Sequence, residues 1–174
     1  KQETSEVSLF SLFSLFLTLT FFFTLFFLLV KPIFFFRKNV TVHGDSMSPT
    51  LLNNSVLAIN DAKNNQIERN QIVEYLSHYQ GNDVMKIGRI IGLPGESIFI
   101  KKGSVYINDA QIIEPYLPSE EKTASFSTNA TVLKQNEFYI LGDNRKNSID
   151  SRIYGPIHRD QIKGVFDKCI SGCK

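Results

Sequence analysis

The feature that most constrains this chain is a run of uncharged residues, mainly Leu, Phe, Ser, Thr and Val, over positions 7–30. A helix of about 20 apolar residues crosses roughly 30 Å of hydrocarbon, so this run predicts a transmembrane anchor. A cleaved signal peptide has an apolar core of only about 7–15 residues behind a basic segment, which fits less well. The run therefore predicts an N-terminal flank at 1–6, a single span at 7–30, a juxtamembrane linker at 31–38 and a separate domain at 39–174.

The charges beside this run predict an orientation. Lys31, Arg37 and Lys38 follow the run, whereas Glu3 and Glu6 precede it. Cytoplasmic flanks of membrane spans carry an excess of Lys and Arg, so this balance by itself places the C-terminal domain in the cytoplasm.

Beyond position 38 the sequence consists of short runs of β-type residues separated by turn-forming residues. Lys102-Gly103 and Asn108-Asp109 are typical of tight hairpin turns. Residues 117–134, rich in Ser, Thr, Glu and Lys, predict a long exposed loop. The pattern predicts an all-β, mostly antiparallel domain behind one N-terminal transmembrane helix, with strands at 40–43, 55–59, 71–76, 83–91, 97–101, 104–107, 111–113 and 138–141.

Composition excludes several classes of function. The formal net charge is +2, and the second half has neither a basic stripe nor interleaved aromatics, so no nucleic-acid partner is expected. The three histidines are scattered and only two cysteines occur, so neither a metal nor another cofactor is expected. Cys169 and Cys173 can form a small-loop disulfide in an extracytoplasmic domain, and two free thiols fit the sequence as well.

Ser46 lies among small and turn-forming residues, just after a β-type run at 40–42. A serine presented at a strand end is a candidate nucleophile, although an ordinary turn serine has the same local sequence. A serine hydroxyl is a weak nucleophile at its free pKa, so a catalytic role requires a base nearby.

Three segments, in this order, resemble the motifs of the type I signal peptidase (leader peptidase) family. They are residues 44–51 (Gly-Asp-Ser-Met-Ser-Pro-Thr-Leu), 89–96 (Arg-Ile-Ile-Gly-Leu-Pro-Gly-Glu) and 142–152 (Gly-Asp-Asn-Arg-Lys-Asn-Ser-Ile-Asp-Ser-Arg). The third segment continues to Tyr154-Gly155-Pro156, and residues 103–108 with 114–117 are similar to the family's hairpin. The resemblance extends from about residue 7 to the C-terminus.

The resemblance implies a β-rich catalytic domain that rests on the outer membrane surface and removes signal peptides from exported preproteins after small residues. Its implied partners are preprotein signal peptides and membrane lipid, and the substrate is expected to lie extended beside strands that flank the nucleophile. The implied location is the cell membrane, single-pass, with the C-terminal domain on the extracytoplasmic side. That side is opposite to the one that the flanking charges predict.

The resemblance also assigns roles to residues. It implies Ser46 as the nucleophile, within an oxyanion and substrate-binding turn formed by Gly44, Asp45 and the backbone N–H of Ser46. Some relatives add a hydroxyl donor at the position of Gly44, which has no side chain to donate. Ser148 matches a serine that orients the catalytic lysine. The third motif also supplies residues with implied structural roles, which are Asp143 as a buried carboxylate and Asp150 with Arg152 as an ion pair.

The main departure from the family pattern concerns the general base. The family has a lysine immediately before the arginine that matches Arg89, and this chain has Gly88 there. Lys86 lies two residues earlier and projects from the same face of a regular strand, about 6.6 Å away along it. It is the nearby candidate for a substitute base if its long stem and a local bulge cover that gap. A solvated strand lysine or a substrate-side contact is the more ordinary interpretation, and His43 is a weaker candidate base.

Two functions follow from these motifs. The first is a membrane-anchored serine endopeptidase of the signal peptidase I type. The second is a catalytically impaired relative that binds peptides or pilin subunits and assists surface pilus assembly, because family members that lack part of the Ser-Lys pair occur beside pilus genes of Gram-positive bacteria. A lost general base costs about 10²–10⁴ in rate, so peptide binding would survive where cleavage did not.

Overall fold

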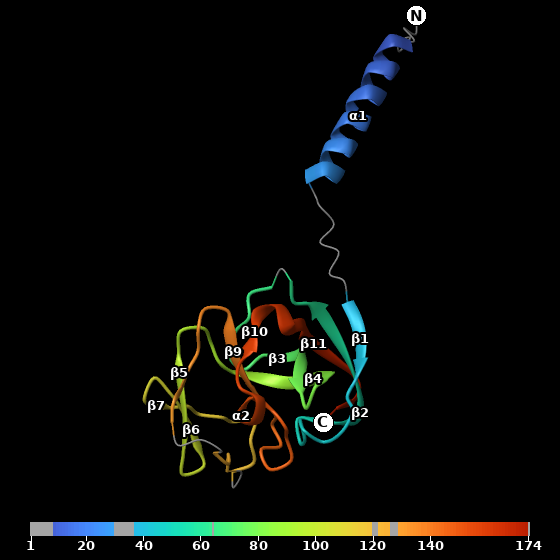
Figure 1. Cartoon of the computed structure of the whole chain (residues 1–174). Helices are drawn as coiled ribbons and strands as arrows, with labels where there is room; N and C mark the ends of the chain where they lie inside the picture. Colours follow the sequence, from blue (N-terminus) through green and yellow to red (C-terminus); the bar gives the residue numbers. More distant parts are fainter. Residues whose placement is uncertain (1–8, 30–36, 64, 120–121, 126–128, 174) are drawn as a thin grey trace, which may run out of the picture. The chain divides into compact units, whose positions relative to one another are not determined.

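The computed structural model of the chain describes residues 9–29, 37–63, 65–119, 122–125 and 129–173. The chain divides into two compact units, Lys1–Phe34 and Phe35–Lys174. Figure 1 shows the helix α1 (Leu9–Leu29) in the first unit and a β-rich domain in the second. The predicted flank at 1–6 and positions 31–36 of the predicted linker lie outside the described residues.

The first unit contains the helix α1 (Leu9–Leu29), which falls within the stretch predicted as a membrane span. Among the residues that the structure describes, no helix has the combination of length and apolarity needed to cross a membrane.

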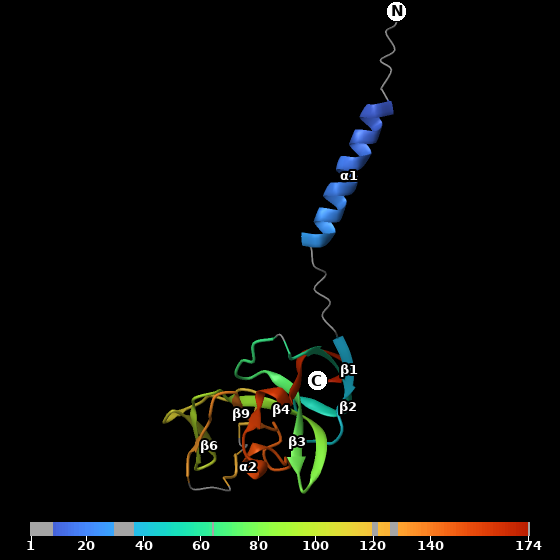
Figure 2. The same ribbon diagram turned by 45° about the horizontal axis from the view of Figure 1, so that its top comes forward.

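Seven strands form the main sheet of the second unit, in the order β1-β2-β11-β3-β4-β9-β10. All of its pairings are antiparallel, which confirms the predicted all-β, mostly antiparallel fold. Figure 2 shows the long arrows of β3 and β4 side by side as a hairpin. The strands are β1 (Arg37–Thr41), β2 (Leu51–Asp61), β3 (Ile72–Tyr79), β4 (Asn82–Gly92), β9 (Glu137–Leu141), β10 (Ile157–His158) and β11 (Ile162–Cys173).

A smaller sheet with the order β7-β6-β5-β8 lies at one side of the domain, away from β1 and β2 (Figure 1). The two predicted hairpin turns connect its strands, and Lys102, Gly103, Asn108 and Asp109 all have positive φ. Two-residue loops of type I′ require this backbone conformation, so the turn prediction is confirmed. The strands are β5 (Ser97–Lys101), β6 (Ser104–Ile107), β7 (Ala110–Gln111) and β8 (Thr131–Val132), and the short helical turns of the domain are α2 (Ser151–Tyr154) and η1 (Arg159–Gln161).

β11 is the longest strand of the main sheet and joins β2 to β3, yet the sequence analysis predicts no strand there. Gly164 and Gly172 interrupt its β-type residues, and its register with β2 shifts at three points. A strand that bulges repeatedly loses the strict alternation from which strands are predicted. The central position of β11 is therefore decided by long-range pairing rather than by its local pattern.

The described part of the stretch 117–134 includes buried residues, which the predicted exposed loop does not. It contains β8, and Thr123 and Leu133 are almost fully buried, at 2% and 1% exposed. Leu133 packs in the core of the smaller sheet, and Thr123 accepts a hydrogen bond from the guanidinium of Arg145. These partners are distant in sequence, so local composition does not indicate them.

Cys169 and Cys173 form a disulfide with a Cα–Cα distance of 6.2 Å, which decides between the two states that the sequence left open. Both cysteines belong to β11, and Cys173 pairs with Leu51 at the start of β2. Ser55, which is fully buried, donates its hydroxyl to the carbonyl of Gly172 at 2.7 Å. The disulfide therefore lies where the end of β11 meets the strand that follows the Ser46 turn.

Candidate functional site

Ser46 lies in the turn between β1 and β2. Gly44 has φ +85°, a left-handed conformation that favours glycine, and its N–H donates to Asn53 Oδ1 at 2.9 Å. Met47 and Leu51, which are almost fully buried, anchor the turn in an apolar cluster beneath β1 and β2. Ser46 itself is half-buried. The turn is thus fixed by its apolar neighbours while the serine stays at the surface of the domain.

The third family-like motif packs directly against this turn. Asn144 donates its backbone N–H to the carbonyl of Ser46 at 2.9 Å, and its side chain donates to the carbonyl of Asp45 at 3.1 Å. A Cβ atom on Gly142 would overlap both Ser148 Oγ and the Ser46 carbonyl oxygen. Only glycine therefore permits this close approach, which brings Ser148 beside the Ser46 turn.

Gly88, at the position expected for the base, faces a filled part of the core. A Cβ on Gly88 would lie 2.6 Å from Ile140 Cγ2 and 3.1 Å from Tyr75 Cε1. Both neighbours are buried, and the Tyr75 hydroxyl is held by a hydrogen bond of 2.6 Å to that of Tyr154. Ordinary contacts between carbon atoms are about 3.5–4.0 Å, so a lysine stem has no room here unless the core rearranges.

Lys86 projects from the same face of β4 as Gly88, as predicted. It pairs across the sheet with Tyr75, and Gly88 pairs with Val73. Its amine donates to the Ile149 carbonyl at 2.9 Å and lies 5.7 Å from the centre of the Tyr154 ring. Burial lowers the pKa of Lys86 from its ordinary value, and the carboxylate of Asp150 acts in the opposite direction. The amine therefore reaches the chain segment that carries Ser148.

Ser46, Lys86 and Ser148 line one groove of about 880 Å³. Its walls come from β1 and the Ser46 turn on one side and from β4 and residues 146–149 on the other. Gly44, Asp45 and His43 line it as well, whereas Gly88 does not. Among the described residues no hydrogen bond links the hydroxyl of Ser46 to the amine of Lys86. The structure brings the predicted nucleophile and the nearby lysine into one groove without direct contact.

The acidic residues of the third motif form buried ion pairs. Asp150 binds the guanidinium of Arg152 through two contacts of 2.8 Å and accepts the Gly142 N–H at 3.1 Å. Asp143 binds Arg89 through contacts of 2.8 and 2.5 Å, and neither carboxylate is exposed beyond 1%. These pairs fix the loop that supports Ser148, so both acidic residues have structural contacts of the predicted kind.

Several residues that shape the site are not predicted from the sequence. Tyr75, whose hydroxyl is hydrogen-bonded to that of Tyr154, packs beside Gly88, and Glu74 lies in the groove in an ion pair with Lys38. Glu74 interrupts an apolar strand run, which is a signal of a buried charge that sequence reading can detect. Tyr75 matches the ordinary composition of a β-strand and carries no such signal.

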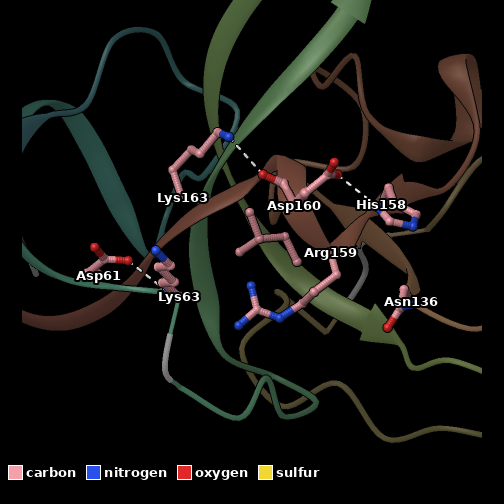
Figure 3. Close-up of a pocket in the computed structure, with 8 residues that line it drawn as sticks. Asp61, Lys63, Asn136, His158, Arg159, Asp160 and Lys163 are labelled. Carbon is pink, nitrogen blue, oxygen red and sulfur yellow. Dashed lines mark hydrogen bonds and ion pairs between the residues drawn. The ribbon is translucent and has the colours of Figure 1, made fainter.

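A second hollow of about 600 Å³ lies around η1, and Figure 3 shows the side chains that line it. Lys163 donates to the backbone carbonyl of Asp160 at 2.7 Å, and Asp160 also binds His158 at 2.8 Å. Its lining residues include no serine, threonine or cysteine, so this hollow offers no hydroxyl or thiol nucleophile. Among the described residues no group of three His, Cys, Asp or Glu side chains is placed to hold a metal ion.

Comparison with known proteins agrees with the resemblance seen in the motifs. Residues 14–170 match the family model described as signal peptidase, peptidase S26. The chain is 36% identical to signal peptidase I S of Bacillus subtilis over 135 residues, which covers 71% of each chain. It is 33% identical to signal peptidase IB of Staphylococcus aureus over 141 residues, covering 71% of this chain and 72% of the relative. A solved signal peptidase I from Enterococcus faecalis aligns with a TM-score of 0.49 at 26% identity, covering 58% of this chain and 97% of that one.

Proposed function

This chain belongs to the signal peptidase family, peptidase S26, and we propose that it is a serine endopeptidase that cleaves signal peptides from exported preproteins. We assign Ser46 as the nucleophile and Lys86 as the general base in place of the lysine that Gly88 has replaced. The observation that carries this assignment is the position of the Lys86 amine, which binds the Ile149 carbonyl next to Ser148 in the groove that Ser46 also lines.

The walls of the groove suit an extended peptide. Among the residues that the structure describes, β1 is an edge strand that pairs only with β2, and β4 pairs with β9 only over its last residues, from Arg89 to Gly92. The first half of β4 and the outer edge of β1 therefore have backbone groups free to pair with a substrate strand. Such β-augmentation holds the scissile carbonyl by main-chain hydrogen bonds while pockets select side chains.

The proposed reaction follows the logic of serine acylation. The neutral amine of Lys86 takes the proton of the Ser46 hydroxyl as the oxygen attacks the scissile carbonyl, and the backbone N–H of Ser46 stabilises the oxyanion. The protonated amine then gives its proton to the leaving amino group of the mature protein. A water molecule, deprotonated by the same amine, hydrolyses the acyl-enzyme. Ser148 holds the amine in position.

Burial of Lys86 favours this role because a lysine must be neutral to accept a proton. The lowered pKa of Lys86 increases the neutral fraction, which is the direction that a general base requires. The amine contacts the Ile149 carbonyl in this structure, so we propose that a rotation of the Lys86 side chain brings it to Ser46. That rotation is part of the proposal, since substrate binding would have to favour it.

We further propose that the β-rich domain works at the extracytoplasmic surface of the cell membrane, in contact with lipid. Support comes from the family resemblance and from the disulfide, because disulfides persist in oxidising compartments. Membrane attachment is tested by carbonate extraction and by protease accessibility of the domain in intact cells.

The proposed activity is tested with a preprotein peptide that contains an Ala-x-Ala site. The full-length chain should cleave it, and Ser46→Ala and Lys86→Met should each abolish cleavage. Lys101→Met is a matched control, because it removes the same charge from the smaller sheet, and it should leave the rate unchanged. Cleavage by the Lys86→Met variant at the wild-type rate would remove Lys86 as the base.

A second candidate function is a non-catalytic factor that binds peptides or pilin subunits and assists pilus assembly. It is favoured by the filled core at Gly88 and by the contact of the Lys86 amine with a carbonyl rather than with Ser46. This reading expects no turnover by the wild type and pilus assembly that tolerates Ser46→Ala. Loss of assembly in that variant alone would exclude it.

A further inference from the structure

Glu74 is a buried carboxylate in the groove that no part of the proposed reaction uses. It belongs to β3, and its side chain is only 6% exposed. It lines both the Ser46 groove and an adjoining cavity of about 140 Å³ beneath β1. Ile87, its partner across the sheet, and Gly164, its partner on β11, are both uncharged. The carboxylate thus lies in the floor of the groove, and Asn60, Asp61 and Lys163 line the adjoining cavity together with it.

Lys38 is the cation that pairs with this carboxylate. Its amine lies 2.8 Å from Glu74 Oε2, yet its own side chain is 58% exposed. Lys38 belongs to β1, the edge strand that forms one wall of the groove. Among the described residues the Glu74 carboxylate has no other hydrogen-bonded or ionic side-chain partner. A fixed anion is therefore paired with a cation that can return to water.

Because Glu74 is buried and Lys38 is exposed, another cation can replace Lys38 beside the carboxylate. An ionised carboxylate that is largely removed from water requires a compensating positive charge. An exposed lysine leaves such a pair at a small cost in free energy, because its amine becomes fully hydrated and its side chain regains rotational freedom. A second cation that arrives on a bound ligand can therefore replace Lys38 at small cost.

A peptide in the groove would bring side chains to this carboxylate. In a strand paired with β1, alternate side chains point to the same face, and one set faces the floor formed by β3 and β4. We propose that Glu74 binds a basic side chain, Lys or Arg, of the peptide substrate, and that Lys38 occupies this subsite when the groove is empty. The inference rests on the proposed function only in taking the groove as the peptide-binding site.

The experiment measures peptide binding rather than cleavage. Fluorescent peptides with an Ala-x-Ala site bind to the full-length Ser46→Ala chain, with lysine placed at one position at a time on both sides of the cleavage site. Norleucine peptides of the same length are the neutral reference. We expect roughly three- to tenfold tighter binding for lysine at one position, or at two positions separated by one residue, as a single charge-assisted contact provides.

Three further substitutions identify the anion. Glu74→Gln should abolish the preference for lysine over norleucine, and Lys38→Met should enlarge it, because it leaves the carboxylate unpaired. Lys146→Met removes an equal charge from the same groove and serves as the matched control; it should leave the lysine preference unchanged. Thermal melting of each variant shows whether it is folded.

The two variants change the preference in opposite directions, so failure of one to fold still leaves the other as a test. Equal binding of lysine and norleucine peptides by the Ser46→Ala chain and its Lys38→Met derivative would overturn the inference. It would also be overturned if Lys146→Met enlarged the preference for lysine over norleucine as much as Lys38→Met does. Absence of binding by every peptide would overturn it as well. If the wild type cleaves peptides but no variant shows a preference for lysine, the proposed function stands and the inference about Glu74 fails. If lysine is preferred in binding but the wild type does not cleave, the inference stands and the proposed function fails.

Discussion

Replacement of Gly88 by alanine tests whether the position of the missing base is truly closed. Glycine within a strand costs roughly 0.5–1 kcal/mol relative to alanine, so at an open position this substitution would stabilise the protein. Here the new Cβ lies 2.6 Å from Ile140 Cγ2, about 1 Å inside normal contact, and 3.1 Å from the Tyr75 ring. Overpacking of this kind costs about 1–3 kcal/mol, so we expect Gly88→Ala to lower the free energy of unfolding.

A double-mutant cycle isolates the contact. Ile140→Ala alone should cost about 2–5 kcal/mol, because Ile140 is fully buried and its removal leaves a cavity. Gly88→Ala placed in that background should cost much less than alone, since the cavity accepts the added methyl group. We expect a coupling energy of about 1–2 kcal/mol from urea denaturation of the four proteins. Strict additivity, or a stabilising effect of Gly88→Ala alone, would refute the claim that Ile140 closes this position.

Three other perturbations follow from the same contacts. Gly88→Lys should lower the melting temperature without raising the rate of preprotein cleavage, because its stem enters the core at Ile140; a large gain in cleavage would show that only the aligned base was absent. Asp143→Asn should reduce the free energy of unfolding in urea by about 3–5 kcal/mol, because it leaves Arg89 buried without its anion; a loss below 1 kcal/mol would contradict this. Replacing Cys169 and Cys173 by serine should cost about 2 kcal/mol by the loop-entropy argument for so short a loop, measured by the same method, and an unchanged midpoint would contradict it.

Local patterns in the sequence predict much of the sheet. β5 and β6 have the predicted bounds, and the hairpin turns at Lys102 and Asn108 follow from residues that accept positive φ. β11 escapes prediction because its glycines and bulges break the alternation, although it lies between β2 and β3. Its position in the sheet depends on pairing with strands about a hundred residues earlier, and the local sequence of β11 does not indicate that pairing.

Some features of the site can also be predicted from local sequence, whereas others depend on contacts between distant segments. The family resemblance assigns Ser46 as the nucleophile and matches Ser148 to a serine that orients the catalytic lysine, and the structure places both in one groove. The alternation of a strand predicts that Lys86 faces the same side as Gly88, and the cross-strand pairs agree. The contact of Lys86 with the Ile149 carbonyl and the hydrogen bond between Tyr75 and Tyr154 join segments more than 60 residues apart. Side-chain packing alone determines those contacts.

The central claim is that the amine of Lys86 takes the proton of Ser46, and the pH dependence of cleavage tests it most directly. Cleavage requires the neutral amine, so kcat/KM should rise with pH as Lys86 loses its proton, and burial places that midpoint below the ordinary lysine value of about 10.4. The measurement is kcat/KM for the Ala-x-Ala peptide over the pH range in which Lys86 loses its proton, for the wild type and for Lys86→Met. We expect kcat/KM to rise with pH in the wild type and not in Lys86→Met; the same rise in both proteins would show that Lys86 is not the base.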